Sequence, residues 1–169
     1  EHREFSGEAS SRGSLTLPRC QQRLLDEVAK VNQNITVVLF CGRPMDLRDV
    51  QNKAKAILVA WFPGTEGGPA LARTLYGHCA PQGKLSMAFP FSVSQLPLHY
   101  NQLSTGRPFH GDYKAARFGS KYQDMPLFPL YPFGFGLSYT TFSCSPVTLD
   151  KAVLTKDSSI KASVSVKNT

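Results

Sequence analysis

Two short apolar runs constrain the fold of this chain more than any other feature. Residues 35–40 read Ile-Thr-Val-Val-Leu-Phe, and residues 56–61 read Ala-Ile-Leu-Val-Ala-Trp. Such continuous runs, rich in β-branched residues, are typical of strands buried on both faces of a parallel sheet. Helical spacing predicts helices over about 19–32, 44–50 and 66–76. This alternating order predicts an α/β fold with a mostly parallel sheet that helices cover on both faces.

The second half of the chain has a different texture. Proline and glycine become frequent after Pro81, and only residues 84–89 have the pattern of a further strand there. Residues 97–140 are expected to form a long irregular excursion, and long loops of this kind are often functional.

Near the end of the chain, residues 160–166 alternate between apolar and polar, which predicts a half-buried strand. We expect an earlier strand over residues 141–149. Because two antiparallel strands are not a stable domain, the chain is expected to stop inside a β-sandwich.

Composition excludes several classes of protein. Hydrophobic residues make up 41% of the chain and charged residues 18%, which is ordinary for a soluble globular domain. The net charge is +7, but Lys and Arg are dispersed, so nucleic acid is not the expected partner. The sequence contains neither a membrane span nor a signal peptide. Since it opens on Glu1 instead of methionine, we interpret it as a segment of a longer polypeptide.

Four widely spaced cysteines give limited information. Cys20, Cys41, Cys79 and Cys144 form no Cys-x-x-Cys pair, so we expect no structural zinc site and no other metal. Cys41 follows the first apolar run and is expected to be a buried thiol. This favours a reducing, cytoplasmic location. Two disulfides, with a periplasmic or secreted location, stay open as alternatives.

One carboxylate stands out in the first loop. The motif Ser6-Gly7-Glu8-Ala9-Ser10-Ser11-Arg12 surrounds Glu8 with small hydroxyl residues and places a cation four positions later. Spacing alone is weak evidence, because most loop glutamates are solvated. A small-residue loop nevertheless suits a group that must approach a bound sugar.

Further motifs follow in a fixed order along the chain. They are Gly42-Arg43-Pro44, Trp61-Phe62-Pro63-Gly64-Thr65-Glu66-Gly67-Gly68, Gly83-Lys84-Leu85, Phe89-Pro90, Gln95-Leu96-Pro97, Tyr100-Asn101, Thr105-Gly106-Arg107-Pro108 and Pro129-Leu130-Tyr131-Pro132-Phe133-Gly134-Phe135-Gly136-Leu137-Ser138-Tyr139-Thr140. With the Glu8 motif, they resemble successive segments of glycoside hydrolase family 3 β-glucosidases over nearly the entire chain.

The resemblance implies a fold and a division into domains. Residues 1–137 would be the later part of an (α/β)6 sandwich with its connecting ribbon. Residues 138–169 would begin a fibronectin type III-like domain, so the chain as a whole would be part of the sandwich, an irregular linker and the first strands of a β-sandwich. The (β/α)8 barrel that carries the nucleophilic aspartate of the family would lie before Glu1.

The same resemblance implies an activity. Glu8 would be the general acid/base of a retaining β-glucosidase that hydrolyses terminal non-reducing β-D-glucosyl residues, without metal or organic cofactor. The partners would be a β-glucoside or oligosaccharide substrate and the missing barrel, with no nucleic acid and no membrane; a homodimer stays open. The segment alone is not expected to catalyse, because it lacks the nucleophile.

Four further residues are candidates for binding substrate or supporting the site. Arg12 either orients Glu8 or faces solvent, and Trp61 either stacks on a sugar or is a core or domain-interface aromatic. Lys121 stands where the family commonly has arginine, which puts a bidentate contact in doubt, and Tyr122 follows it.

Two other classes of function compete with the enzyme. A non-catalytic carbohydrate-binding or structural module of the same fold is the main alternative. A flavodoxin-like nucleotide binder would need a phosphate-binding turn, and the glycines at 64, 67 and 68 do not have that spacing.

Overall fold

The computed structural model describes residues 8–9, 12–104, 106–109, 111 and 117–169. Ser6, Gly7, Ser10 and Ser11 of the Glu8 motif, and Thr105 of a later motif, lie outside the described residues. In chain order the elements are α1 (Arg19–Val31), β1 (Thr36–Leu39), α2 (Arg48–Lys53), β2 (Ala56–Val59), α3 (Gly67–Leu75), the 3-10 helix η1 (Val93–Gln95), β3 (Phe142–Cys144), β4 (Thr148–Leu149), β5 (Ala162–Ser163) and β6 (Val166–Asn168).

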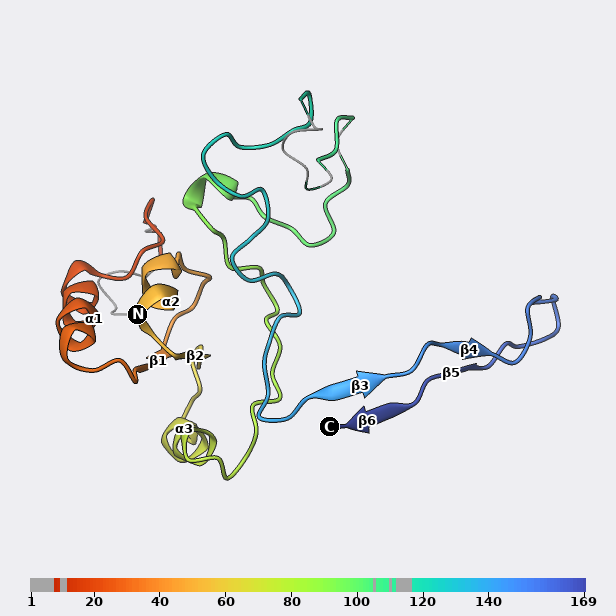
Figure 1. The fold of residues 1–169 in the computed structure, drawn as a ribbon, viewed down its shortest axis with the longest axis horizontal. Helices are drawn as coiled ribbons and strands as arrows, with labels where there is room; N and C mark the ends of the chain where they lie inside the picture. The colour runs from red at the N-terminus through yellow and green to blue at the C-terminus, as the bar shows by residue number, and fades with distance from the viewer. Residues whose placement is uncertain (1–7, 10–11, 105, 110, 112–116) are drawn as a thin grey trace.

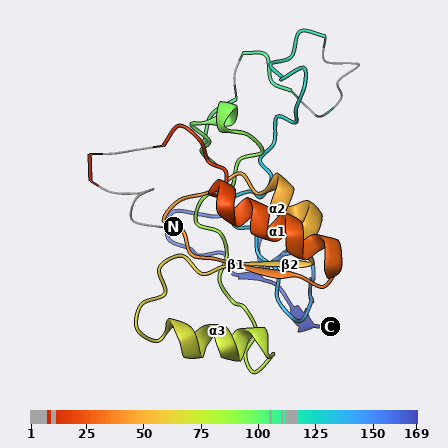
Figure 2. The same ribbon diagram turned by 90° about the vertical axis from the view of Figure 1, so that its left-hand side faces the viewer.

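The two apolar runs form a parallel pair of strands, as predicted, but the predicted burial on both faces was wrong. Leu39 is the one buried residue of β1 and β2, and their other residues are half-buried or exposed because α3 and the helices α1 and α2 cover this two-stranded sheet only in part. In this pair Thr36 of β1 lies opposite Ala56 of β2, and Leu39 lies opposite Val59. α1 and α2 cover one face of the pair, and α3 lies on the other side (Figures 1 and 2). Helical connections give parallel strands this layered arrangement, so the α/β prediction is confirmed for this part of the chain.

The helix α1 presents one apolar side to the sheet. Leu25 is 8% exposed and belongs to the core, whereas the neighbouring Leu24 is 65% exposed. A hydrogen bond from Lys53 of α2 to the Asp26 carboxylate joins the two helices on this face. The predicted helix over residues 19–32 is therefore confirmed, with its packing side defined by the 3.6-residue period.

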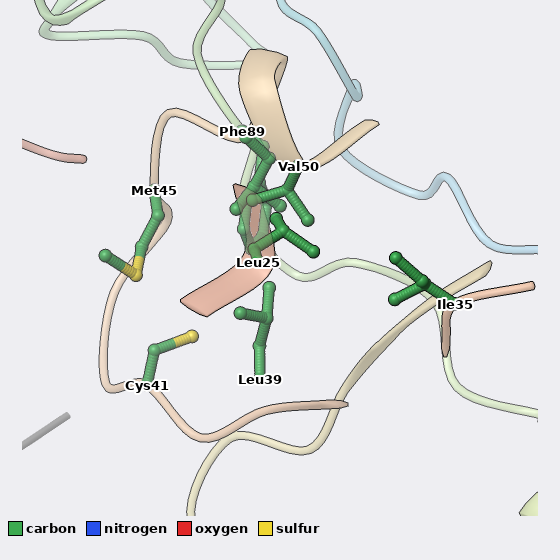
Figure 3. Close-up of a cluster of buried hydrophobic side chains, with 8 residues drawn as sticks. Leu25, Ile35, Leu39, Cys41, Met45, Val50 and Phe89 are labelled. Carbon is green, nitrogen blue, oxygen red and sulfur yellow. The ribbon is translucent and has the colours of Figure 1, made fainter. Parts of the chain in front are cut away.

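A single hydrophobic core fills the space between these helices and the strand pair. Figure 3 shows the side chains that converge there from α1, β1, α2 and the segment between them. The cluster consists of Leu25, Ile35, Leu39, Cys41, Met45, Leu47, Val50 and Phe89. Phe89 is fully buried although it comes from the irregular second half of the chain. This side chain therefore attaches the second half to the α/β layer.

The helix expected to open at Pro44 begins later, at Arg48. Met45 and Leu47 are buried before the helix starts, and the Arg48 N–H donates to the Asp46 carboxylate at 3.2 Å. The Asp46 carboxylate thus accepts a backbone hydrogen bond at the start of α2. Met45 and Leu47 lie outside the helix and pack into the core. The prediction was wrong at this boundary because burial of Met45 and Leu47 outweighs the tendency of proline to open a helix.

Residues 84–89 do not form the regular strand that was predicted, and the chain bends at residues 86 and 87. Leu85 donates to the carbonyl of Phe135 at 2.8 Å, and Gly134 donates to the carbonyl of Leu85 at 2.7 Å. Farther along, Phe89 and Tyr131 exchange backbone bonds in an isolated antiparallel bridge. Prolines and glycines in the partner segment interrupt the ladder, so a narrow ribbon forms in place of a regular sheet.

The C-terminal residues form a two-stranded antiparallel ribbon that projects from the rest of the molecule (Figure 1). β3 pairs with β6, and β4 pairs with β5. The segment expected as one strand over 160–166 is divided between β5 and the first residue of β6, and all residues of these four strands are exposed. The expected half-burial is absent from the described chain, because no second sheet covers the ribbon there.

Candidate functional site

Residues 12–18, between Glu8 and α1, lie toward the carboxyl ends of β1 and β2. α1 runs from this loop to the amino end of β1, so the start of α1 is on the carboxyl side of the sheet. The Asp46 N–H, in the segment that follows β1, donates to the carbonyl of Leu15 at 3.0 Å. Open α/β sheets bind ligands beyond the carboxyl ends of their strands, so we take this edge as the candidate site.

Glu8 and Arg12 lie in different environments. Glu8 is exposed in a turn, and Ala9 after it has a left-handed φ of 57°. Arg12 is half-buried. Its Nη1 atom and the Nε atom of Arg43 are buried without hydrogen-bond partners among the described residues, although both side chains make other interactions. These residues thus offer an accessible carboxylate and two partly buried guanidinium groups.

Trp61 lies just beyond the carboxyl end of β2. Its φ of 52° is left-handed, which is a strained conformation for a bulky side chain. The half-buried indole packs 5.9 Å from the Phe89 ring, centroid to centroid, and borders the hydrophobic core. This is the packing expected of a core or interface aromatic.

The remaining two candidates, Lys121 and Tyr122, lie on the irregular excursion. The Tyr122 hydroxyl donates to the carbonyl of Ser94 at 2.8 Å, and the Lys121 ammonium lies 6.0 Å from the centre of the Phe109 ring. The first contact joins the excursion to η1, and the second joins two parts of the excursion. None of the contacts described here brings the two residues to Glu8.

Gln95 is a structurally important residue that sequence reasoning missed. It is 6% exposed, and its Oε1 accepts from the Phe91 N–H at 2.6 Å. Its Nε2 faces the carbonyls of Pro126, Leu127 and Phe128 at 3.0–3.2 Å. The motif Gln95-Leu96-Pro97 contains this residue, but no periodicity in a loop could indicate that its amide is buried.

Arg48 and Asp46 connect the candidate edge to the region around Phe91 and Gln95. The Arg48 guanidinium binds the Asp46 carboxylate through two hydrogen bonds of 2.9 and 2.7 Å. The guanidinium carbon also lies 4.8 Å from the centre of the Phe91 ring. Burial alone would raise the pKa of Asp46, but the side-chain and backbone hydrogen bonds from Arg48 outweigh it, so the pKa lies below its ordinary value.

A groove of about 450 Å³ lies beside α1 and β1. Its lining includes Leu24, Val28 and Phe40, and Gln21 is its one polar residue among the described residues. A groove with one polar side chain and no charged group offers few of the hydrogen-bonding partners that a sugar requires. We therefore exclude it as the candidate substrate site.

The described residues hold neither a metal-ligating cluster nor a membrane-spanning helix. In that part of the chain, no group of three or more His, Cys, Asp or Glu side chains is arranged to hold a metal ion. None of the helices described has the length and apolar character that crossing a membrane requires. All four cysteines lie within the described residues and form no disulfide there; Cys41 is buried, as predicted.

Comparison with known proteins identifies the family. The sequence pattern of the glycosyl hydrolase family 3 C-terminal domain matches residues 1–139. This chain belongs to glycosyl hydrolase family 3. A periplasmic β-glucosidase of Salmonella typhimurium is 44% identical over 169 residues, which are 100% of this chain and 22% of that protein. A β-xylosidase of Formosa agariphila is 37% identical over 96% of the chain and 21% of its own length.

Solved structures show the same relationship. The crystal structure of a β-glucosidase from Listeria innocua in complex with isofagomine matches this family 3 chain with a TM-score of 0.89 and 39% identity. The match covers 99% of this chain and 23% of the Listeria chain. The family 3 chain therefore spans less than a quarter of the length of these relatives.

Proposed function

We propose that this chain supplies the general acid/base of a retaining β-glucosidase, and that Glu8 is that residue. The observation that carries the proposal is the Ser-Gly-Glu motif, whose carboxylate is exposed in a family 3 domain and precedes residues 12–18 at the carboxyl edge. An accessible carboxylate can approach a glycosidic oxygen, which a buried one could not. Relatives named β-glucosidases support terminal β-D-glucosyl residues as the substrate, while the Formosa β-xylosidase makes xylosides the first alternative.

The proposed chemistry needs a second carboxylate from elsewhere in the polypeptide. In a retaining glycosidase one carboxylate attacks the anomeric carbon and the other, about 5–5.5 Å away, protonates the leaving oxygen. Glu8 would give its proton in the first step and take one from water in the second. We place the nucleophilic aspartate on a barrel domain of the same polypeptide, outside this chain.

The proposed architecture follows the same assignment. Residues 1–137 would complete the later part of an (α/β)6 sandwich, and residues 138–169 would open a fibronectin type III-like domain. The match of the C-terminal domain pattern to residues 1–139 supports this boundary, as does the change from helix-covered parallel strands to an antiparallel ribbon.

The test is Glu8→Gln in the full-length enzyme that carries this chain. The amide keeps the size of the side chain but can neither donate the proton nor activate water. We expect turnover of cellobiose to fall by about 10²–10⁴-fold. An activated aryl glucoside should still form the glycosyl-enzyme, which should accumulate. Azide needs no general base and should restore turnover, with a β-glycosyl azide as product.

Glu66→Gln is the matched control, because Glu66 is an exposed glutamate that precedes α3. This variant should retain the activity of the wild type. Near-wild-type turnover of cellobiose by a folded Glu8→Gln enzyme would show that Glu8 is not the acid/base. A wild type that binds oligosaccharides but hydrolyses no glycoside would favour the non-catalytic module.

A further inference from the structure

The buried side-chain amide of Gln95 joins the two chain segments from which the excursion begins and ends, which we call its base. We define the arm as residues 97–104 and 117–125, which extend from this base. The Gln95 side chain accepts from Phe91 on one side and faces the carbonyls of residues 126–128 on the other, at 2.6–3.2 Å. The Tyr122 hydroxyl adds a bond of 2.8 Å to Ser94. The two ends of the arm are therefore tied to each other through side chains, not through a regular ladder.

The same base is fixed to the candidate edge. The Phe91 ring lies under the Arg48 guanidinium, which holds Asp46, and the Asp46 N–H bonds the loop that follows Glu8. Next to Phe91, Phe89 is fully buried and packs against Trp61 at the end of β2. The arm thus leaves the body from the carboxyl edge of the sheet, the side on which residues 12–18 lie, between Glu8 and α1.

The surface of the arm is aromatic and cationic. Tyr100 is 71% exposed, and its ring stacks on Phe133 with centroids 4.1 Å apart. Phe118 is also 71% exposed, with the Arg117 guanidinium 5.4 Å from its ring centre. The C–H face of a pyranose packs on aromatic rings, and its hydroxyls accept hydrogen bonds from cationic groups. A sugar ring is a ligand that suits such a surface.

We infer that Gln95 is a positioning residue that fixes the arm at the carboxyl edge, so that the arm binds the leaving-group sugar of the substrate. This inference rests on the proposed function, in which the Glu8 proton goes to the oxygen shared with that sugar. A preorganised arm lowers the entropic cost of binding the second ring. Gln95 touches no reacting atom, so its effect should appear in KM for substrates that have such a ring.

The experiment compares two substrates in the full-length enzyme. Cellobiose and methyl β-D-glucoside both release an unactivated alcohol that Glu8 must protonate, but only cellobiose has a leaving-group sugar. In Gln95→Leu we expect KM for cellobiose to rise about tenfold, with kcat/KM for methyl β-D-glucoside within about twofold of the wild type. Tyr122→Phe removes the hydrogen bond to the Ser94 carbonyl and should raise KM for cellobiose about two- to threefold. Gln82→Leu is the matched control, because Gln82 is exposed and outside the base of the arm, and it should leave KM and kcat for both substrates unaffected.

Several outcomes distinguish the inference from its alternatives. Equal losses on both substrates, or no loss on either, would overturn the positioning role of Gln95. If Gln95→Leu does not fold, Tyr122→Phe decides: a selective rise in KM for cellobiose supports the inference, and an unchanged ratio between the substrates overturns it. A wild type inactive on both substrates is a different result, since it contradicts the proposed function itself.

Discussion

At the scale of single residues, two glycines show how the same crowding can have different costs. A Cβ on Gly136 would lie 2.8 Å from the carbonyl oxygen of Gly83, which is a backbone atom and cannot rotate away. A Cβ on Gly42 would lie 2.8 Å from the ring of Phe62, whose side chain is 69% exposed and can rotate. The first obstacle is fixed and the second can move.

We therefore expect Gly136→Ala to lower the free energy of unfolding by about 1–3 kcal/mol, as overpacking does. Gly42→Ala should change it by no more than about 0.5 kcal/mol, since the Phe62 ring can move away. Urea denaturation of the two variants measures both values. A larger loss for Gly42→Ala would mean that the Phe62 ring is held in place.

The Asp46 carboxylate gives a prediction that depends on pH. Its pKa lies below the ordinary value, so its stabilising contribution is present above the pKa of the unfolded state and is lost as the pH falls through the lower pKa of the folded state. Arg48→Ala removes the two side-chain hydrogen bonds to Asp46 but leaves the backbone N–H bond and the burial. We expect the Asp46 pKa to rise and the variant to lose about 1 kcal/mol at pH 7. NMR titration of the carboxyl carbon measures the pKa, and an unchanged value would contradict the assigned cause.

At the scale of elements, α1 is stabilised by the side it turns to the sheet. Leu25 is in the core, while Leu24 lines the apolar groove and is mostly exposed. Leu25→Ala should cost about 2–4 kcal/mol, because it leaves a cavity beside β1. Leu24→Ala changes the same atoms at the adjacent position and should cost less than about 1 kcal/mol. Thermal denaturation compares them, and similar losses would show that the groove is filled in solution.

At the scale of the whole molecule, the C-terminal ribbon and the α/β body should unfold independently. The strands of the ribbon are exposed, and Figure 1 shows them projecting away from the body. The last described side-chain contact with α3 before the ribbon is the hydrogen bond from the Tyr139 hydroxyl to Thr74. A chain that ends at Thr140 should keep the Tm of the body within about 2 °C. A fall of several degrees would reveal packing between the ribbon and the body.

Much of the fold could be predicted from local pattern. The continuous β-branched runs that became β1 and β2 indicate strands by their composition. The apolar spacing in α1 indicates a helix because helical geometry repeats every 3.6 residues. The Ser-Gly-Glu motif indicates Glu8 through its resemblance to the family, since spacing alone is weak evidence. These features are encoded by residues close together in the chain.

Only the tertiary structure decided what the irregular residues do. Phe89 fills the core, Gln95 closes the base of the arm, and Asp46 joins a loop thirty residues earlier to the start of α2. Each of these roles depends on partners far away in sequence, and no periodicity in a loop specifies them. The sequence by itself determined the α/β layer, because short-range backbone geometry suffices for it. It made Glu8 the candidate acid/base only through the family resemblance, and that role stays a prediction. Burial and long-range hydrogen bonding decided the pairing of residues 84–89 with 131–135, the contacts of Gln95 and the start of α2. These interactions form only when segments that are distant in sequence meet.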